Sequence, residues 1–425
     1  IYIIGRIIIE LGGKQWAVII SGMALLFSPS LLRSSSLFQP VIWNQLAWLI
    51  CAYWVLKIIK ENKDKYYYYL GLTVGVAFLN KYSIVFYMAA LVIGLLLTPQ
   101  RTILFKKATI IALGLAIIIA APNLYWQWSH GWPVIAHMTE LQETQLVHIQ
   151  WGGFIKEQFL FHMMSGVLWM AGMYGVFRYI AFYQYRYIIF SFIATVLIIG
   201  SLSGKAYYTI GAFYILFPFG AIALEKMLDH AWMKYAILTS IVFINLPIAP
   251  IGAPLIPIQH FAKYSAAFSN ITGIDDFLYW EDGKQYDLPQ DYADMHGWEE
   301  MVGKVATHYH AFPDSLKAKT ILFGASYGHA GALNFYKDKY HLPEAYSSNA
   351  SYLWWADEQV QFDQVICVMD DYITRPWTSF NSFTFLDSLN NPYARDPGYI
   401  YLMHDAHSDP NISWKAYFES ERGGD

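Results

Sequence analysis

Two lysines stand where apolar runs of the sequence end, and tyrosines follow each of them closely. Lys81 comes directly after the run at 66–80, and Lys205 lies between the runs at 187–202 and 207–224. An ionisable side chain at membrane depth is costly, so each lysine is a candidate for function. An ammonium group beside tyrosine hydroxyls suits a phosphate or diphosphate. The alternative is that each lysine only extends toward the membrane surface among interfacial tyrosines.

The segment that opens at Pro122 mixes aromatic and polar side chains. It reads Pro122-Asn-Leu-Tyr-Trp-Gln-Trp-Ser-His-Gly-Trp-Pro133 and continues to the carboxylates of Glu140 and Glu143. Sugars pack their C–H faces on aromatic rings while their hydroxyls need hydrogen bonds, so this mixture fits a sugar site. An aromatic belt on an interfacial amphipathic helix explains it equally well. The two glutamates are weak candidates for a general base.

Three patterns in the C-terminal part are weaker. His404 and His407 have metal-ligand residue types, but a solvated loop explains them better. His308 and His310 are two positions apart and do not share a helix face. The segment Phe323–Gly331 follows a strand-like run, yet it lacks the spaced glycines of nucleotide sites. We therefore expect no metal and no cofactor.

Long apolar runs must position these residues. The chain has 425 residues, of which 56% are hydrophobic and 14% charged, against roughly 25% charged residues in soluble proteins. A helix that crosses a hydrocarbon layer of about 30 Å needs about 17 to 25 residues. We expect a membrane all-α multi-helix bundle with eight spans and one shorter run, at 16–32, 42–59, 83–98, 107–122, 159–177, 187–202, 207–224, 233–250 and 66–80.

Basic residues are distributed unevenly over the connections between these runs. If the first run leads outward, the connections on one side hold twelve Lys and Arg, and those on the other side hold four. Lys and Arg near helix ends stay on the cytoplasmic side. We therefore expect a multi-pass protein of the inner (plasma) membrane, with the loop 123–158 and everything after residue 250 outside the cytoplasm.

The charge balance reverses near residue 260. Residues 1–259 hold 17 basic and 8 acidic residues, whereas 260–425 hold 11 and 24. We expect the membrane part over 1–250, a proline-rich linker over 251–259 that cannot continue a helix, and a small soluble α/β domain over 260–425.

A strand–helix–strand order within this domain predicts at least one parallel strand pair. The expected elements are a helix at 298–311, a strand at Thr320–Ala325, a helix at 328–338 and a strand at Gln364–Met369.

Several motifs follow one another along nearly the whole chain. They are Phe38-Gln-Pro40, Asn44-Gln-Leu-Ala-Trp48, Leu79-Asn-Lys-Tyr-Ser83, Leu96-Leu-Thr-Pro99, Pro122-Asn-Leu-Tyr-Trp-Gln-Trp128, His130-Gly-Trp-Pro133, Gly204-Lys-Ala-Tyr-Tyr208, Tyr327-Gly-His-Ala-Gly-Ala-Leu-Asn-Phe-Tyr336 and His341-Leu-Pro343. In order and spacing, these segments together resemble bacterial members of glycosyltransferase family 39. This is the GT-C group that contains the protein O-mannosyltransferases and the lipid A aminoarabinose transferase.

The resemblance implies a GT-C-like bundle that transfers a sugar from a polyprenyl-phosphate carrier to an extracytoplasmic protein, glycolipid or cell-envelope polymer. It implies that the lipid phosphate meets Lys81 with Tyr82 and Lys205 with Tyr207 and Tyr208. Membrane lipid is a further expected partner, and nucleic acid is not.

The aromatic segment supplies the other candidate substrate contacts, which are Asn123, Trp126, Gln127 and His130.

Three departures from the family pattern are visible. The family's acidic general base lies in the first outer loop, and we expect this chain to begin after that point. Asn44 stands where relatives often have Asp, and Ser347-Ser-Asn-Ala-Ser-Tyr352 lacks the usual His.

Two other functions remain open at this point. A polyprenyl-lipid transporter or flippase would share the bundle and the outer cations. The other possibility is a non-catalytic membrane subunit. Transporters usually show internal symmetry or paired broken helices. The sequence indicates a single break, near Asn80.

Overall fold

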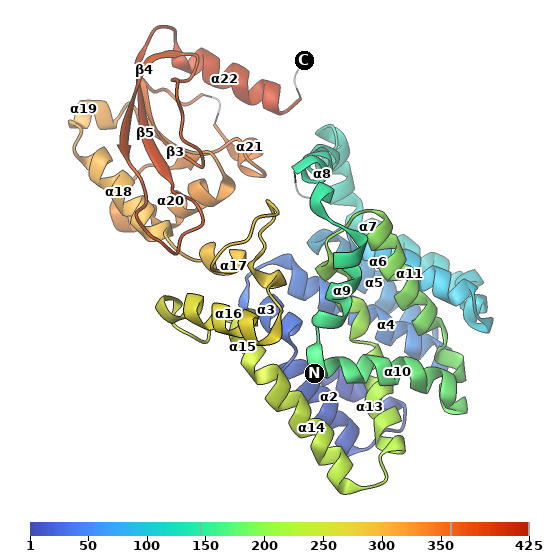
Figure 1. The fold of residues 1–425 in the computed structure, drawn as a ribbon. Helices are drawn as coiled ribbons and strands as arrows, with labels where there is room; N and C mark the ends of the chain where they lie inside the picture. The colour runs from blue at the N-terminus through green and yellow to red at the C-terminus, as the bar shows by residue number, and fades with distance from the viewer. Residues whose placement is uncertain (145, 358, 424–425) are drawn as a thin grey trace. The chain divides into compact units, whose positions relative to one another are not determined.

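The computed structural model of this protein is mostly helical and describes residues 1–144, 146–357 and 359–423. Figure 1 shows its helices and the strands of one sheet in the C-terminal part. The chain forms two compact units, which we describe separately. The first unit holds residues 1–260 and 281–284, and the second holds residues 261–280 and 285–425.

The first unit is built from helices and short 3-10 turns (η). Its earlier elements are α1 (Tyr2–Glu10), α2 (Gln15–Leu26), α3 (Pro29–Ser36), α4 (Pro40–Glu61), α5 (Asp64–Asn80), α6 (Ile84–Leu96), η1 (Pro99–Phe105) and α7 (Lys107–Ser129). Its later elements are α8 (Pro133–Thr144), η2 (Leu146–His148), α9 (Trp151–Leu160), η3 (Met163–Ser165), α10 (Gly166–Arg178), η4 (Ile180–Tyr185), α11 (Tyr187–Ser201), η5 (Ala206–Thr209), α12 (Ile210–Phe213), α13 (Leu216–Met227), α14 (Ala231–Asn245), η6 (Leu246–Ile248) and α15 (Ala249–Gly252).

Three helices are long and apolar enough to cross a membrane by length and composition: Pro40–Glu61, Lys107–Ser129 and Ala231–Gly252. Three further pairs qualify together but are bent, α2–α3 by 58°, α9–α10 by 81° and the η5–α12 segment against α13 by 52°. The described residues thus hold up to six spans where the sequence predicted eight. The expected spans at 83–98 and 187–202 correspond to the shorter apolar helices α6 and α11.

Two of the bends meet, and hydrogen bonds join them. Pro29 follows the first bend, and its ring has no N–H for a continuing helix. The hydroxyl of Ser28 lies 2.8 Å from Nδ1 of His162, which stands at the second bend. The backbone N–H of Ser30 donates to the carbonyl of Phe161 at 3.1 Å. Helix breaks away from water need such internal partners.

Glycines let neighbouring helices approach closely. A Cβ at Gly220 on α13 would lie 1.7 Å from the carbonyl oxygen of Leu168 on α10. A Cβ at Gly94 on α6 would lie 2.1 Å from the hydroxyl of Ser191 on α11. Small residues at helix contacts are typical of membrane bundles, where packing replaces the hydrophobic effect.

One expected helix end is wrong. Pro122 lies inside α7, which continues to Ser129, and helices α8 and α9 fill most of the segment 123–158 that was expected as a loop. A proline inside a helix removes one backbone hydrogen bond, and the hydrogen bonds on either side of it keep the helix continuous. The span expected at 233–250 agrees with the helical path Ala231–Gly252 to within two residues. Pro247 and Pro250 lie in the first turns of η6 and α15, where a missing N–H costs little.

The second unit contains one sheet and the helices around it. Its elements, with α16 leading in, are α16 (Ile258–Thr272), η7 (Asp276–Leu278), α17 (Gln290–Ala293), α18 (Trp298–His310), α19 (Asp314–Lys317), β1 (Thr320–Gly324), α20 (Tyr327–Tyr340), β2 (Ala345–Tyr346), α21 (Tyr352–Trp355), β3 (Gln364–Met369), β4 (Phe380–Asp387), β5 (Tyr399–Ala406) and α22 (Pro410–Glu421).

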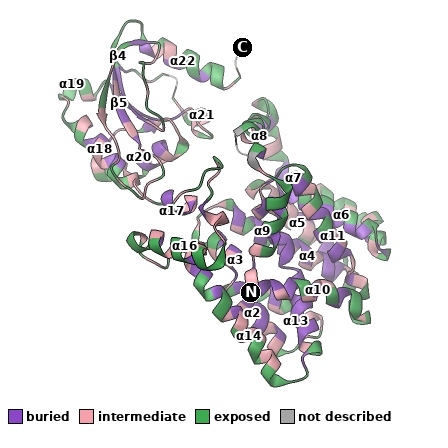
Figure 2. Ribbon diagram, in the orientation of Figure 1, coloured by how far each residue is buried: buried purple, intermediate pink, exposed green. Residues whose placement is uncertain are grey.

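The sheet has the strand order β2-β1-β3-β5-β4. Strand β1 runs parallel to β2 and β3, whereas β5 runs antiparallel to β3 and β4. The central strands are buried (Figure 2). The sheet contributes to two hydrophobic clusters. Helices α18 and α20 belong to one cluster, and Trp414 and Phe418 of α22 belong to the other. The predicted parallel pair is confirmed, and the strand Gln364–Met369 has the predicted bounds.

Candidate functional site

Lys81 lies in the short loop between α5 and α6, and hydrogen bonds hold this loop. The side-chain amide of Asn80 donates to the carbonyl of Pro40 at 3.0 Å. The N–H of Lys81 donates to the carbonyl of Ala77 at 2.9 Å, which closes the last turn of α5. The ammonium group of Lys81 lies over the ring of Tyr208, 4.8 Å from its centre. The loop thus directs the lysine toward the segment that carries Lys205.

Lys205 lies in the loop between α11 and η5, and a close-packed glycine fixes this loop. Gly204 is buried, and its N–H donates to the carbonyl of Ile199 at 2.8 Å. A Cβ at Gly204 would lie 2.8 Å from Cγ2 of Ile199, so a larger residue would push the loop outward. Ser203 has a φ of 52°, a left-handed conformation that is uncommon outside glycine. The backbone of Lys205 therefore has little freedom.

The structure brings Lys81, Lys205, Tyr207 and Tyr208 together. The rings of Tyr207 and Tyr208 pack edge to face with centroids 4.6 Å apart. Lys81 lies over Tyr208, three residues along the chain from Lys205. Burial, together with the like charge of Lys205, holds the pKa of Lys81 below its usual range. Two cations gathered in a partly buried place favour an anion beside them.

Lys205 has an acidic partner that the sequence did not indicate. Its ammonium group forms an ion pair with Glu281, which belongs to the first unit. The side chains of Lys205 and Glu281 keep 17% and 37% of their exposure, so water reaches the pair. No local pattern could have revealed Glu281, because it lies 76 residues from Lys205 in the chain.

Tyr82 links the loop of Lys81 to α7. Its hydroxyl donates to Oδ1 of Asn123 at 2.7 Å and accepts a hydrogen bond from Nε2 of Gln127 at 3.2 Å. Gln127 is buried, and its Oε1 accepts from the N–H of Val134 at 3.2 Å. Three predicted site residues thus form one network. The network fixes the position of the Lys81 loop against α7.

Trp126 and His130 form a separate pair one helical turn apart. Their rings stack with centroids 4.4 Å apart and an interplanar angle of 22°. Nδ1 of His130 lies 2.8 Å from the carbonyl oxygen of Trp126. An exposed flat ring beside a polar ring suits a sugar face, and it also suits an interfacial aromatic belt.

Glu140 and Glu143 lie on α8, a helix apart from the loops that carry the two lysines. Both are exposed, and a carboxylate oxygen of Glu140 lies 3.7 Å from Nδ1 of His137. Neither glutamate belongs to the group of lysines and tyrosines described above.

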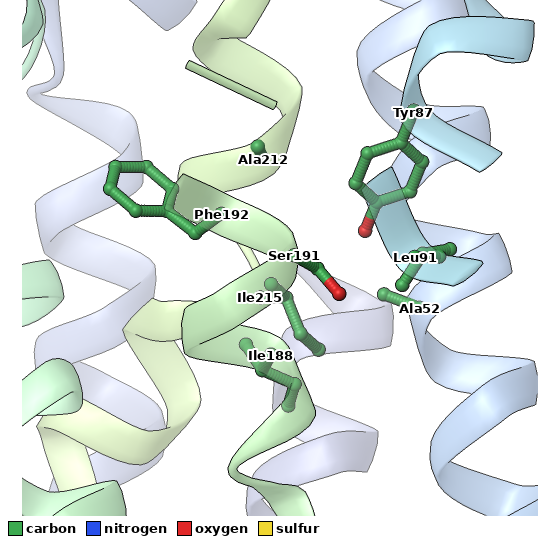
Figure 3. Close-up of a pocket in the computed structure, with 8 residues that line it drawn as sticks. All are labelled: Ala52, Tyr87, Leu91, Ile188, Ser191, Phe192, Ala212 and Ile215. Atoms are coloured by element: carbon green, nitrogen blue, oxygen red, sulfur yellow. The ribbon is translucent and has the colours of Figure 1, made fainter. Parts of the chain in front are cut away.

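A void inside the bundle is a packing space and not a substrate site. It has no room for a water molecule. Figure 3 shows its lining from α4, α6, α11 and the α12 region: Ala52, Tyr87, Leu91, Ile188, Ser191, Phe192, Ala212 and Ile215.

Comparison with known proteins shows a family similarity for the N-terminal part of the chain. Residues 1–126 match the family model described as dolichyl-phosphate-mannose-protein mannosyltransferase. The resemblance is confirmed over these residues. The lipid A galacturonosyltransferase RgtD of Rhizobium johnstonii (strain DSM 114642 / LMG 32736 / 3841) is 38% identical over 72 residues, which are 17% of this chain and 15% of that protein. No solved structure matches the chain.

The match to the mannosyltransferase family covers part of the candidate site. Lys81, Tyr82, Asn123 and Trp126 lie within the matched residues, whereas Lys205 and its tyrosines lie beyond them. Lys81 therefore lies in the segment that matches the family model, and its contact partner Tyr208 lies outside that segment.

Proposed function

We propose that this chain is a membrane glycosyltransferase that transfers a sugar from a polyprenyl-phosphate donor to an extracytoplasmic acceptor. The observation that carries the proposal is the gathering of Lys81 and Lys205 around Tyr208. The match of residues 1–126 to a mannosyltransferase family supports the reaction class. The similarity to a lipid A galacturonosyltransferase supports sugar transfer in a membrane setting.

The two lysines would hold the phosphate of the donor. In the transfer step, the bond from C1 of the sugar to the phosphate oxygen breaks, and the phosphate leaves with the electron pair. The new bond joins C1 to the acceptor oxygen, whose proton passes to a carboxylate base. Ammonium groups held in place before the reaction stabilise the charge that develops on the leaving phosphate. The partial burial of Lys81 strengthens this interaction by lowering the local dielectric.

Glu281 would neutralise Lys205 while no donor is bound. A donor phosphate offers charged oxygens of the same kind, and it would replace the carboxylate at Lys205. This exchange leaves no buried charge without a partner in either state. Because the pair is partly exposed, the displaced carboxylate can be hydrated.

The candidate site would face the outside of the inner membrane in a GT-C-like bundle. The uneven distribution of basic residues between the connections supports this orientation. A reporter that is active only outside the cytoplasm should work when fused after Gln259 and fail when fused after Lys107. An inactive reporter after Gln259 would reverse the orientation and the access to both lysines.

Transport of a polyprenyl lipid is a second candidate function. The three bent helix pairs favour it, because broken helices often build the binding sites of transporters. The sequence indicated only one break, and this spoke against transport. The three bent pairs in the structure weaken that argument. In both functions the lysines would bind a lipid phosphate. Only the transferase cleaves the bond between sugar and phosphate.

Membrane vesicles that contain the protein would separate the two functions. The vesicles receive a panel of radiolabelled polyprenyl-phosphate sugars, and both transfer of the label and its movement across the bilayer are measured. The proposal predicts that one donor loses its sugar, and that this loss depends on Lys81 and Lys205. Movement of intact donor without cleavage would instead establish transport.

A further inference from the structure

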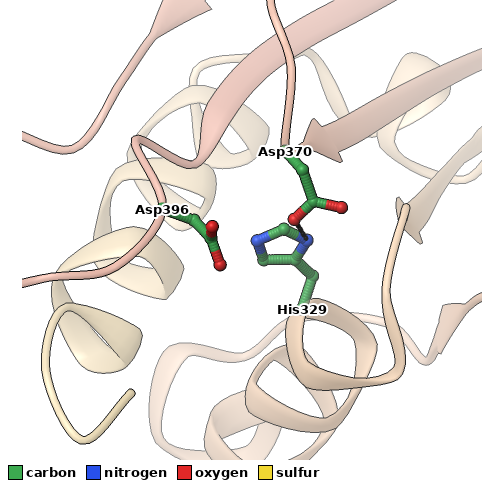
Figure 4. A group of neighbouring side chains, drawn as sticks. All are labelled: His329, Asp370 and Asp396. Atoms are coloured by element: carbon green, nitrogen blue, oxygen red, sulfur yellow. Dashed lines mark ion pairs between the residues drawn. The ribbon is translucent and has the colours of Figure 1, made fainter. Parts of the chain in front are cut away.

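The second unit gathers three side chains of metal-binding type at one end of its sheet. His329 lies in the first turn of α20, Asp370 directly follows β3, and Asp396 lies three residues before β5. One nitrogen or carboxylate oxygen from each lies within 4.8 Å of the others. Figure 4 shows the two carboxylates on opposite sides of the imidazole. None of the histidines singled out in the sequence belongs to this group.

The sheet topology explains why these residues meet. Strands β1 and β3 are parallel neighbours, so the segments that follow them leave the same edge. Strand β5 runs antiparallel to β3, and Tyr399 at its start pairs with Met369 at the end of β3. The chain leaves β1 toward β2 on one side and later enters β3 on the other. The end of β1 is therefore a topological switch point, where open α/β sheets bind ligands.

The imidazole of His329 is buried, with 1% of the residue exposed, and one of its nitrogens is open. Nδ1 lies 3.2 Å from the hydroxyl of Ser326 and 3.6 Å from Oδ1 of Asp370. Within the described part of the chain, Nε2 has no hydrogen-bond partner. A ring nitrogen that has no hydrogen-bond partner is free to bind a ligand. In histidines that bind a metal through one ring nitrogen, the other ring nitrogen is commonly hydrogen-bonded to a neighbouring group, as Nδ1 is here.

A small cavity and an excess of negative charge accompany the open nitrogen. The cavity has a volume of about 10 Å³ and adjoins His329 and Asp396, which is room for about one water-sized particle. Asp370 and Asp396 each bring a carboxylate to this place, and the guanidinium of Arg395 lies 3.9 Å from a carboxylate oxygen of Asp396. Two carboxylates thus lie close together in a partly buried place, and a bound cation would neutralise their charge.

We propose that His329, Asp370 and Asp396 bind one divalent metal ion of the Zn²⁺ or Mn²⁺ type. One imidazole nitrogen and two carboxylate oxygens are donors that these ions accept, and the two carboxylates balance the double charge. Ligand atoms about 2.1 Å from a tetrahedral ion lie roughly 3.4 Å apart. Small side-chain rotations from the observed arrangement would therefore close the site. The ion would tie together the segments that adjoin β1, β3 and β5.

Metal counting on the whole chain tests this site without any measurement of sugar transfer. The protein is purified in detergent, stripped with a chelator and dialysed against Zn²⁺ or Mn²⁺, and bound metal is counted by mass spectrometry. We expect one ion per chain and a higher midpoint of thermal unfolding. His329→Asn, Asp370→Asn and Asp396→Asn should each weaken binding at least tenfold. His407→Asn changes an exposed histidine outside the group and should bind as the wild type does.

Asp396→Asn is the deciding variant, because the side chain of Asp396 is less buried than that of His329, so its loss threatens the fold less. Cooperative thermal unfolding of the stripped variant shows that it is folded. An unaltered chain that binds neither ion would overturn the site, and so would full metal binding by folded Asp396→Asn. Both results are independent of the proposed transferase, whose lysines belong to the other unit.

Discussion

The ammonium group of Lys81 lies 4.8 Å from the centre of the Tyr208 ring. This contact joins the loop after α5 to the segment after α11, so two lysines from distant parts of the chain face one place. The tyrosine is the link, because it touches the first lysine and belongs to the same short segment as the second.

Tyr208→Leu removes the ring beneath the ammonium group of Lys81. A cation–π contact is worth about 0.5 to 2 kcal/mol, so we expect binding of a polyprenyl phosphate to weaken roughly two- to thirtyfold. Tyr208→Phe keeps the ring and should stay within about twofold of the wild type. Binding of a radiolabelled polyprenyl phosphate to the purified protein measures both. An unchanged leucine variant would mean that the contact plays no part in binding.

Gly204→Ala should disturb the loop that positions Lys205. The added Cβ meets Cγ2 of Ile199 at 2.8 Å, and overpacking of this kind costs about 1 to 3 kcal/mol. We expect a lower midpoint of thermal unfolding and weaker donor binding. Gly152→Ala on α9 is the matched control, since its Cβ would meet nothing within 4 Å. Equal midpoints for the two variants would show that the loop adapts freely.

Glu281→Gln removes the carboxylate that pairs with Lys205. If donor phosphate and carboxylate compete for this lysine, the variant should bind donor more tightly, by up to about fivefold, the range for partly exposed ion pairs. The gain should shrink at high salt and vanish in a Lys205→Met background. Asp282→Asn, at the neighbouring position, is the control. Weaker binding by Glu281→Gln would instead mean that the carboxylate serves the donor directly.

The sequence predicted best the elements with dense apolar runs. Strand β3 is buried along nearly its whole length and was predicted with the correct bounds. Strand β4 was missed, because all its residues after Phe380 are only partly buried or exposed, so its sequence resembles a loop. The helix bends were missed for a different reason. An apolar run keeps its composition through a bend, and Ser28 and His162 resemble ordinary interruptions until the fold pairs them.

The candidate site was predictable only where its residues lie in local motifs. Lys81 and Lys205 each end an apolar run, so their types and positions were visible in the sequence. Glu281 and the His329 group depend on pairings between distant segments, which no local spacing encodes. Tyr82 was predicted as a substrate contact, and the structure shows it in a hydrogen-bond network with α7.

The most direct test of the account is donor binding by Lys81→Met and Lys205→Met. Methionine keeps an apolar stem of similar length, so folding should persist. A charged hydrogen bond contributes about 1.5 to 3 kcal/mol, so each variant should bind a polyprenyl phosphate roughly ten- to a hundredfold more weakly. Lys156→Met, which changes an exposed lysine on α9, should bind normally. Wild-type affinity in either folded variant would contradict a phosphate site built by both lysines.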